Sequence, residues 1–137
     1  MKKVILAIAL LLASGSAQAQ TSETSTFQAI ITHQLQAIAK DDGASAYSDA
    51  APMVQQKFPS PDIFMSMVRN GYPPIYRNKS YSFGETGVDP AGRPYQRVQI
   101  FGADGALYDA LYFMEQQPDG SWKISGCVMA MAKGDDA

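Results

Sequence analysis

The chain has 137 residues, 46% of them hydrophobic, and a formal net charge of −2. An acidic chain without a basic stripe binds nucleic acid and anionic lipid poorly, so both partners are excluded. Cys127 is the only cysteine, so no intramolecular disulfide forms and packing must stabilise the fold. One histidine and one cysteine also fall short of the ligands that a zinc site needs, and we expect no metal and no cofactor.

The first 19 residues have the features of an export signal. Lys2 and Lys3 precede an apolar run over Val4–Ala13, which is too short to span a bilayer as a helix. Ala17-Gln18-Ala19 has the small-x-small pattern that signal peptidase cuts, which predicts a periplasmic or secreted protein of a Gram-negative bacterium without a membrane segment after cleavage. The predicted organisation is a signal peptide, a flexible N-terminus, a single domain and a polar tail, over residues 1–19, 20–25, 26–132 and 133–137.

The first half of the mature chain carries helical signals. One apolar stripe with the spacing of a helix face consists of Phe27, Ile30, Ile31, Leu35 and Ile38. This spacing predicts a helix from Ser25 or Thr26 to about Ala39. Gln34 lies at the centre of its apolar face, and His33 points toward solvent.

Three shorter helices are expected next. Asp41 or Asp42 caps a helix over residues 44–51, and Pro52 begins a further turn that runs to Phe58. Ser60-Pro61-Asp62 is a strong start signal for a helix that ends at Gly71. The side chains that this helix turns inward are Ile63, Phe64, Met67 and Val68. Tyr72-Pro73-Pro74 then predicts extended chain, with a first strand over residues 80–84.

Three strand-like runs joined by two Asp-Gly pairs occupy residues 95–101, 106–116 and 122–131. Asp-Gly between alternating runs is typical of a β-hairpin. We interpret both pairs as two-residue loops, which places Val98 opposite Leu111 and Phe113 opposite Gly126. A three-residue second loop is the alternative, and it moves Trp122 and Ile124 to the other face.

Two-residue loops sort the sheet into two faces. The aliphatic face, whose polar members are Gln96, Asp109 and Glu115, consists of Val98, Ile100, Leu107, Leu111, Phe113, Trp122, Ile124 and Val128. The second face carries mainly aromatic and polar side chains and includes Tyr95, Arg97, Gln99, Phe101, Tyr108, Tyr112, Met114 and Lys123. We expect the aliphatic face to meet the helices, which gives an α+β fold of N-terminal helices packed on a curved antiparallel sheet.

Six segments form a longer pattern along the chain. They are Ile31-x-x-Gln34-x-x-Ala37, Lys40-Asp41-Asp42, Phe64-x-x-Met67-Val68, Tyr72-x-Pro74 with Ile75-Tyr76-Arg77, Gln96-x-Val98, and Asp119-Gly120-Ser121-Trp122-Lys123-Ile124-Ser125-Gly126-Cys127. Taken in order, they resemble the bacterial family of domains of unknown function numbered 4864, over nearly the whole mature chain. That family resembles the nuclear-transport-factor-2-like, or cystatin-like, group. The resemblance implies a cone-shaped cavity and frequent dimerisation, but it carries no catalytic residues.

Three functions remain open at this point. The first is a small-molecule-binding or protein-interaction module with an apolar cavity, in which the ligand-binding candidates are Gln34, Tyr47, Tyr72 and Asp109. The second is a lyase or isomerase with Asp109 as general acid or base, because an acid on an apolar face suits proton transfer. The third is a structural homodimer with a filled core. The chain has no Gly-x-Ser-x-Gly elbow, and a catalytic His33 is not expected.

Self-association is the expected protein partnership. Tyrosine, methionine and arginine are enriched at protein interfaces, and the second face of the sheet is rich in these residues. The predicted homodimer contact consists of Tyr95, Phe101, Tyr108, Tyr112 and Met114. The alternatives are an ordinary solvated sheet face and a face covered by residues 72–77.

Overall fold

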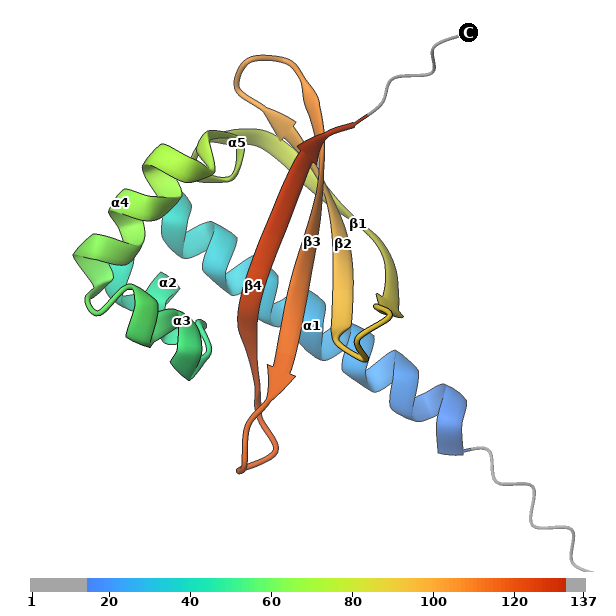
Figure 1. Cartoon of the computed structure of the whole chain (residues 1–137). Coiled ribbons are helices and arrows are strands. Elements are labelled where there is room, and N and C mark those ends of the chain that lie inside the picture. The colour runs from blue at the N-terminus through green and yellow to red at the C-terminus, as the bar shows by residue number, and fades with distance from the viewer. Residues whose placement is uncertain (1–14, 133–137) are drawn as a thin grey trace, which may run out of the picture.

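The computed structural model describes residues 15–132, and side chains from residue 23 onward. Most of the predicted export signal and the polar tail over 133–137 lie outside the described residues. The fold is α+β, as predicted: helices pack against a four-stranded antiparallel sheet with the order β1-β2-β3-β4 (Figure 1). None of the described helices is long and apolar enough to cross a membrane.

The long helix α1 (Gly15–Ala39) lies across one face of the sheet (Figure 1). It begins earlier than the predicted Ser25 or Thr26, so the helix includes residues 20–25. Its inward face agrees with the predicted stripe: Phe27, Ile31 and Leu35 are buried, and His33 is exposed.

Short helices follow with the caps that the sequence predicts. They are α2 (Gly43–Ser48), α3 (Pro52–Lys57), α4 (Pro61–Gly71) and α5 (Pro73–Tyr76). Asp42 caps α2 by accepting from the Ser45 backbone N–H, and Ser60 caps α4 by accepting from the Ile63 N–H at 3.1 Å.

Two expectations about these helices are wrong. The prolines after Tyr72 do not force extended chain but begin α5. The N–H groups of a first helical turn have no acceptor within the helix, so proline, which lacks an N–H group, fits there. In α4, Met65 is buried whereas Ile63 is 47% exposed, so the buried face is rotated from the predicted one.

The strands are β1 (Asn78–Val88), β2 (Pro94–Gly102), β3 (Leu107–Gln116) and β4 (Trp122–Met131). Both C-terminal hairpins form, but each loop has three residues, because the backbone pairs Gly102 with Ala106 and Gln117 with Ser121. The third loop residue is Gly105 or Gly120, with φ of +84° and +87°. This is the left-handed conformation that glycine adopts at no steric cost.

The longer loops reverse the predicted face of β3. Val98 lies opposite Ala110, not Leu111, and Gln99 lies opposite Asp109. The helix-facing side of β3 therefore consists of Tyr108, Ala110, Tyr112 and Met114. The outward side, which we had assigned to the core, consists of Leu107, Asp109, Leu111, Phe113 and Glu115.

In the second hairpin, the strand pairing differs from the prediction near the loop and agrees with it farther along the strands. Its longer loop pairs Met114 with Ile124, and an irregularity between Phe113 and Met114 restores the predicted pairing of Phe113 with Gly126. Trp122 and Ile124 consequently face the helices, as predicted, whereas Val128 is 54% exposed on the other side.

The core joins the first helix to the last strand. The Phe27 and Trp122 rings meet edge to face, with centroids 4.9 Å apart. Ala50 forms a parallel bridge to Ile124: the Ala51 N–H donates to the Ile124 carbonyl, and the Ile124 N–H donates to the Asp49 carbonyl, both at 2.8 Å. The α2–α3 connection thereby covers part of the β4 edge and holds α3 beside the sheet.

Candidate functional site

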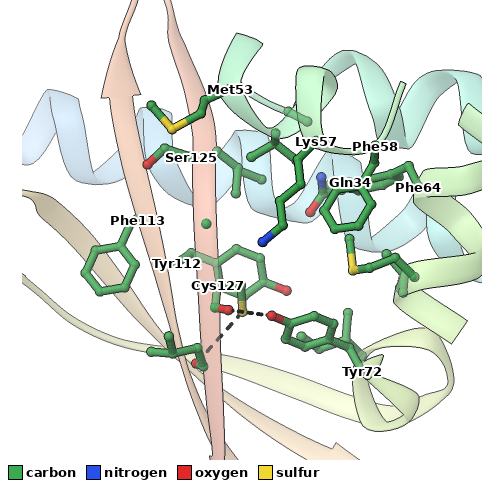
Figure 2. A pocket seen from close by; sticks show the side chains of 18 of the residues that line it. Gln34, Met53, Lys57, Phe58, Phe64, Tyr72, Tyr112, Phe113, Ser125 and Cys127 are labelled. Atoms are coloured by element: carbon green, nitrogen blue, oxygen red, sulfur yellow. Dashed lines mark hydrogen bonds between the residues drawn. The ribbon is translucent and has the colours of Figure 1, made fainter. Parts of the chain in front are cut away.

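A cavity of about 630 Å³ lies between the helix-facing side of β3 and β4 and the short helices α3, α4 and α5. Its lining also includes Phe113 and Val128 from the outward side of the sheet and Arg93, which lies over the Phe113 ring. Figure 2 shows that side chains from all of these elements point into it. Its wall is mainly apolar and includes Ile38, Val54, Phe64, Met67, Val68 and Ile124. Concave, largely apolar hollows of this size, with a few polar groups, are typical of small-molecule sites.

The buried hydroxyl of Tyr112 is the most informative polar group in this wall. Tyr112 is 1% exposed, and its hydroxyl is the one buried side-chain polar atom of the described residues that has no hydrogen-bond partner. Burial raises the pKa of Tyr112 well above its usual value, so the group stays protonated and able to donate. Such groups are rare because leaving one unpaired costs about 1–3 kcal/mol.

Tyr72 and Cys127 lie next to Tyr112 in the cavity wall (Figure 2). The Tyr72 hydroxyl donates to the Cys127 carbonyl at 2.8 Å, which ties α5 to the edge strand β4. Cys127 as a residue is half-buried, but its thiol is enclosed, and this burial raises its pKa to about 12. At neutral pH the thiol is therefore a neutral, apolar part of the wall.

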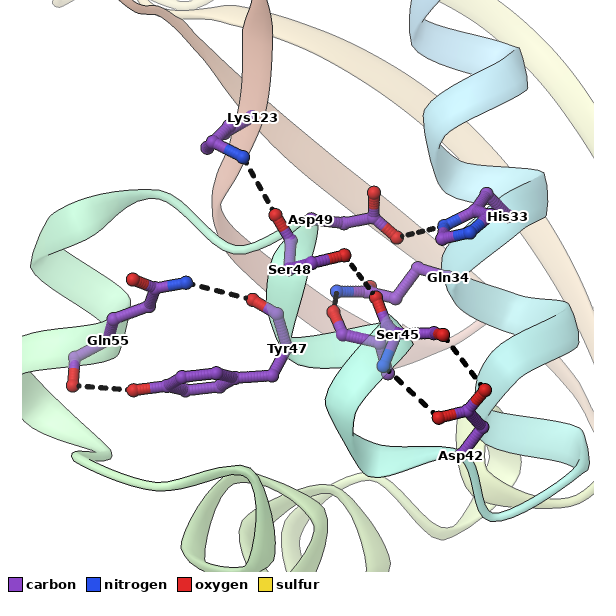
Figure 3. Close-up of polar contacts among 10 residues, drawn as sticks. His33, Gln34, Asp42, Ser45, Tyr47, Ser48, Asp49, Gln55 and Lys123 are labelled. Atoms are coloured by element: carbon purple, nitrogen blue, oxygen red, sulfur yellow. Dashed lines mark hydrogen bonds and ion pairs between the residues drawn. The ribbon is translucent and has the colours of Figure 1, made fainter.

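Gln34 reaches the cavity from the middle of α1, as the sequence predicts. It is 5% exposed, and its amide nitrogen donates to the Ala46 carbonyl at 3.2 Å, which ties α1 to α2 (Figure 3). No described residue donates to its amide oxygen. The structure thus brings Gln34 and Tyr72, two of the four predicted site residues, into one cavity.

Tyr47, the third predicted site residue, is not part of the wall. Its hydroxyl donates to the carbonyls of Gln55 and Phe58, at 3.1 and 2.8 Å, and the Gln55 side chain donates back to the Tyr47 carbonyl (Figure 3). These bonds fix the C-terminal end of α3 against α2. Tyr47 therefore positions the helix end from which Lys57 and Phe58 reach the cavity.

Asp109, the fourth predicted site residue, lies on the other side of the sheet. It is opposite Gln99 and Ala130 on the outward face, and it does not line the cavity. The expectation that Asp109 and Gln34 point into the same space is wrong. The loop over residues 103–105 has three residues rather than two, and this moves Asp109 to the outward face of β3.

The charges of the cavity wall are all positive. Lys57 and Arg93 line it, and the wall contains no aspartate or glutamate. Arg93 pairs with Asp89 at 2.7 Å and lies 4.2 Å from the centre of the Phe113 ring. Lys57 forms no ion pair with any described residue. Its ammonium nitrogen lies 5.7 Å from the centre of the neighbouring Phe58 ring.

Other polar features of the described residues are less suited to a site. His33 Nδ1 lies 2.6 Å from Asp49, and burial raises the pKa of this carboxyl, but the pair lies outside the cavity (Figure 3). A second hollow of about 580 Å³ beside Ile30 and Trp122 is more open and holds no unpartnered buried group. Within residues 15–132, no group of three potential metal ligands comes together.

The residues of the predicted dimer surface lie on two different faces of the sheet, because the register of β3 differs from the predicted one. Tyr112 and Met114 are buried beneath the helices, and Tyr108 is on the same side. Tyr95 and Phe101 remain on the outward face, where Phe101 is 38% exposed. The five residues therefore do not form one surface.

A comparison with known protein families identifies the family of this chain. The model of the domain of unknown function DUF4864 matches residues 20–137. The chain belongs to this family. No curated protein and no solved structure matches it. The DUF4864 match covers every residue of the cavity wall, and the family description assigns no activity to any of them.

We expect Tyr112→Phe to make the DUF4864 domain more stable. The change removes a buried hydroxyl that has no partner, so the free energy of unfolding should rise by about 1 kcal/mol. Tyr72→Phe is the matched control, because it removes a hydroxyl that donates at 2.8 Å and should lower the free energy by a similar amount. Urea unfolding of both variants measures the two effects. Equal destabilisation would mean that the Tyr112 hydroxyl has a partner in solution.

Proposed function

We propose that this DUF4864 domain is an exported module that binds one small apolar molecule in the cavity between β4 and α3–α5. The cavity itself, with its mainly apolar wall, carries the proposal. An apolar wall supplies binding free energy through burial of the ligand, and a few polar groups orient it. Gln34 is the orienting group, and Tyr72 and Tyr47 hold the wall in place.

The proposal includes a fold relationship. We infer that the domain is related to the nuclear-transport-factor-2-like group, because a long N-terminal helix crosses one face of an antiparallel sheet (Figure 1) and a cavity lies beneath the helices. Fold kinship alone does not specify a ligand. The proposal therefore rests on the cavity itself and assigns no role to Asp109.

A titration with 1-decanol, a neutral apolar probe, tests the proposal. We expect saturable binding of one molecule per chain by isothermal titration calorimetry, with thermal stabilisation that grows with probe concentration. Val54→Trp should abolish binding, because Val54 lines the cavity and the larger ring fills it. Gln56→Trp is the control: Gln56 lies on the same helix but is exposed and outside the wall.

Two results would overturn the proposal. One is the absence of saturable decanol binding to the wild-type protein. The other is equal binding by wild type and Val54→Trp, which would put the probe elsewhere. Met67→Trp, which fills the cavity from α4, replaces Val54→Trp if that variant does not fold by circular dichroism.

A further inference from the structure

The charge of the cavity wall differs from that of the whole protein. The chain has more acidic than basic residues, with a net charge of −2, yet the wall carries two cations and no carboxylate. A wall of one sign in an apolar hollow favours a ligand of the opposite sign. The charge pattern therefore distinguishes an anionic apolar ligand from a neutral or cationic one.

Lys57 is the cation available to a ligand. Arg93 is already engaged by Asp89 and the Phe113 ring, whereas Lys57 has no carboxylate partner among the described residues. Figure 2 shows its ammonium group pointing from α3 toward Tyr112 and Cys127. The hydrogen bonds of Tyr47 to the Gln55 and Phe58 carbonyls hold this end of α3 in place.

A carboxylate is the head group that suits this position. It carries the charge opposite to that of Lys57, and its oxygens accept hydrogen bonds from an ammonium group. The Tyr112 hydroxyl is not available to such a head group, because it is completely buried.

We infer that the ligand is an apolar monocarboxylate, whose head group accepts from Lys57 and whose hydrocarbon body packs against the α3, α4 and β4 side chains. This inference rests on the proposed binding function and specifies its ligand class. Lys57 supplies the charge that selects the head group. The apolar wall supplies most of the affinity.

Decanoate and 1-decanol, compared by calorimetry at pH 7.5 and low salt, test the inference. They share a hydrocarbon chain and differ in the head group. We expect decanoate to bind about fivefold more tightly than decanol, the gain expected from a partly solvated ion pair. The preference should shrink as salt is added, because ions screen the Lys57 charge.

Two substitutions assign the preference to its residues. Lys57→Gln should abolish the preference, so that decanoate and decanol bind with about equal affinity, while the affinity for decanol is retained. Lys40→Gln is the matched control, since it removes the same charge from an exposed position outside the wall and should leave the preference unchanged.

The outcomes separate the inference from the proposed function. If decanol binds and Val54→Trp blocks it, but decanoate binds no more tightly, the cavity is a binding site and the carboxylate assignment is wrong. An equal loss of the preference in Lys57→Gln and Lys40→Gln would also overturn the inference, because it would show a general effect of net charge. If neither probe binds, the proposed function fails as well.

Discussion

Iodoacetamide should alkylate Cys127 in the native protein at pH 8 about 1,000-fold more slowly than in the urea-unfolded chain. Only the thiolate reacts, and burial of the Cys127 thiol raises its pKa from 9.0 to about 12. Each unit of pKa lowers the thiolate fraction about tenfold at this pH. Mass spectrometry of alkylated protein over time measures the ratio.

A relocated cysteine provides the control for this experiment. The double variant Cys127→Ser, Ser82→Cys has its only thiol at an exposed position of β1, and it should react in the folded state nearly as fast as in urea. A native Cys127 rate within about tenfold of the unfolded rate would contradict the enclosed thiol. It would also mean that the cavity wall beside Tyr112 opens readily to water.

The same thiol makes stability depend on pH in a defined direction. Because the folded pKa lies above the unfolded one, the neutral thiol stabilises the fold fully below pH 9, and this contribution is lost as pH rises from 9 to about 12. The loss amounts to as much as about 4 kcal/mol. Urea unfolding of wild type and Cys127→Ser between pH 8 and 11 isolates the part that is lost by pH 11, about 3 kcal/mol, since the variant lacks the titrating group.

Ala110→Asp should destabilise the protein by at least about 3 kcal/mol. Ala110 is 0% exposed on the helix-facing side of β3, opposite Val98 and Met129, where a carboxylate finds neither water nor a cation. A whole domain of this size is stable by about 5–15 kcal/mol, so the variant is close to unfolding at room temperature. Urea unfolding followed by circular dichroism measures the change.

Leu107→Asp is the matched control for the face of β3. Leu107 belongs to the same strand but points outward and is 40% exposed, so its replacement should cost no more than about 1 kcal/mol. The predicted two-residue loops gave the reverse order, with Leu107 in the core and Ala110 outside. A greater loss in Leu107→Asp than in Ala110→Asp would therefore show that the register of β3 is wrong.

Local signals in the sequence were sufficient for most of the elements. Ser60-Pro61 and Gly71 bound α4 as predicted, and β4 has the predicted limits, because caps and alternating runs are read within a few residues. Local signals were not sufficient for the face of β3, because that face depends on whether Ala103 belongs to the loop or to the strand. Glycine at the third loop position was the signal for the longer loop.

The candidate site was predicted only in part for the same reason. The sequence indicates Gln34 because this polar residue interrupts an apolar helical stripe. The prediction of that stripe does not depend on the register of the strands. Tyr112 was assigned to the wrong face with the rest of β3, and Asp109 took its place in the expected cavity. Lys57 had no sequence signal, since its approach to the cavity depends on the bridge between Ala50 and Ile124.

The edge-to-face contact between Phe27 and Trp122 has a consequence for biosynthesis. A nascent chain leaves the ribosome with Phe27 early and Trp122 late, so the Phe27 ring meets this aromatic partner only after the final hairpin emerges. Contacts that distant in sequence form slowly, and apolar surface that waits for them attracts chaperones. Translation thus delivers this polypeptide with part of its hydrophobic surface still open.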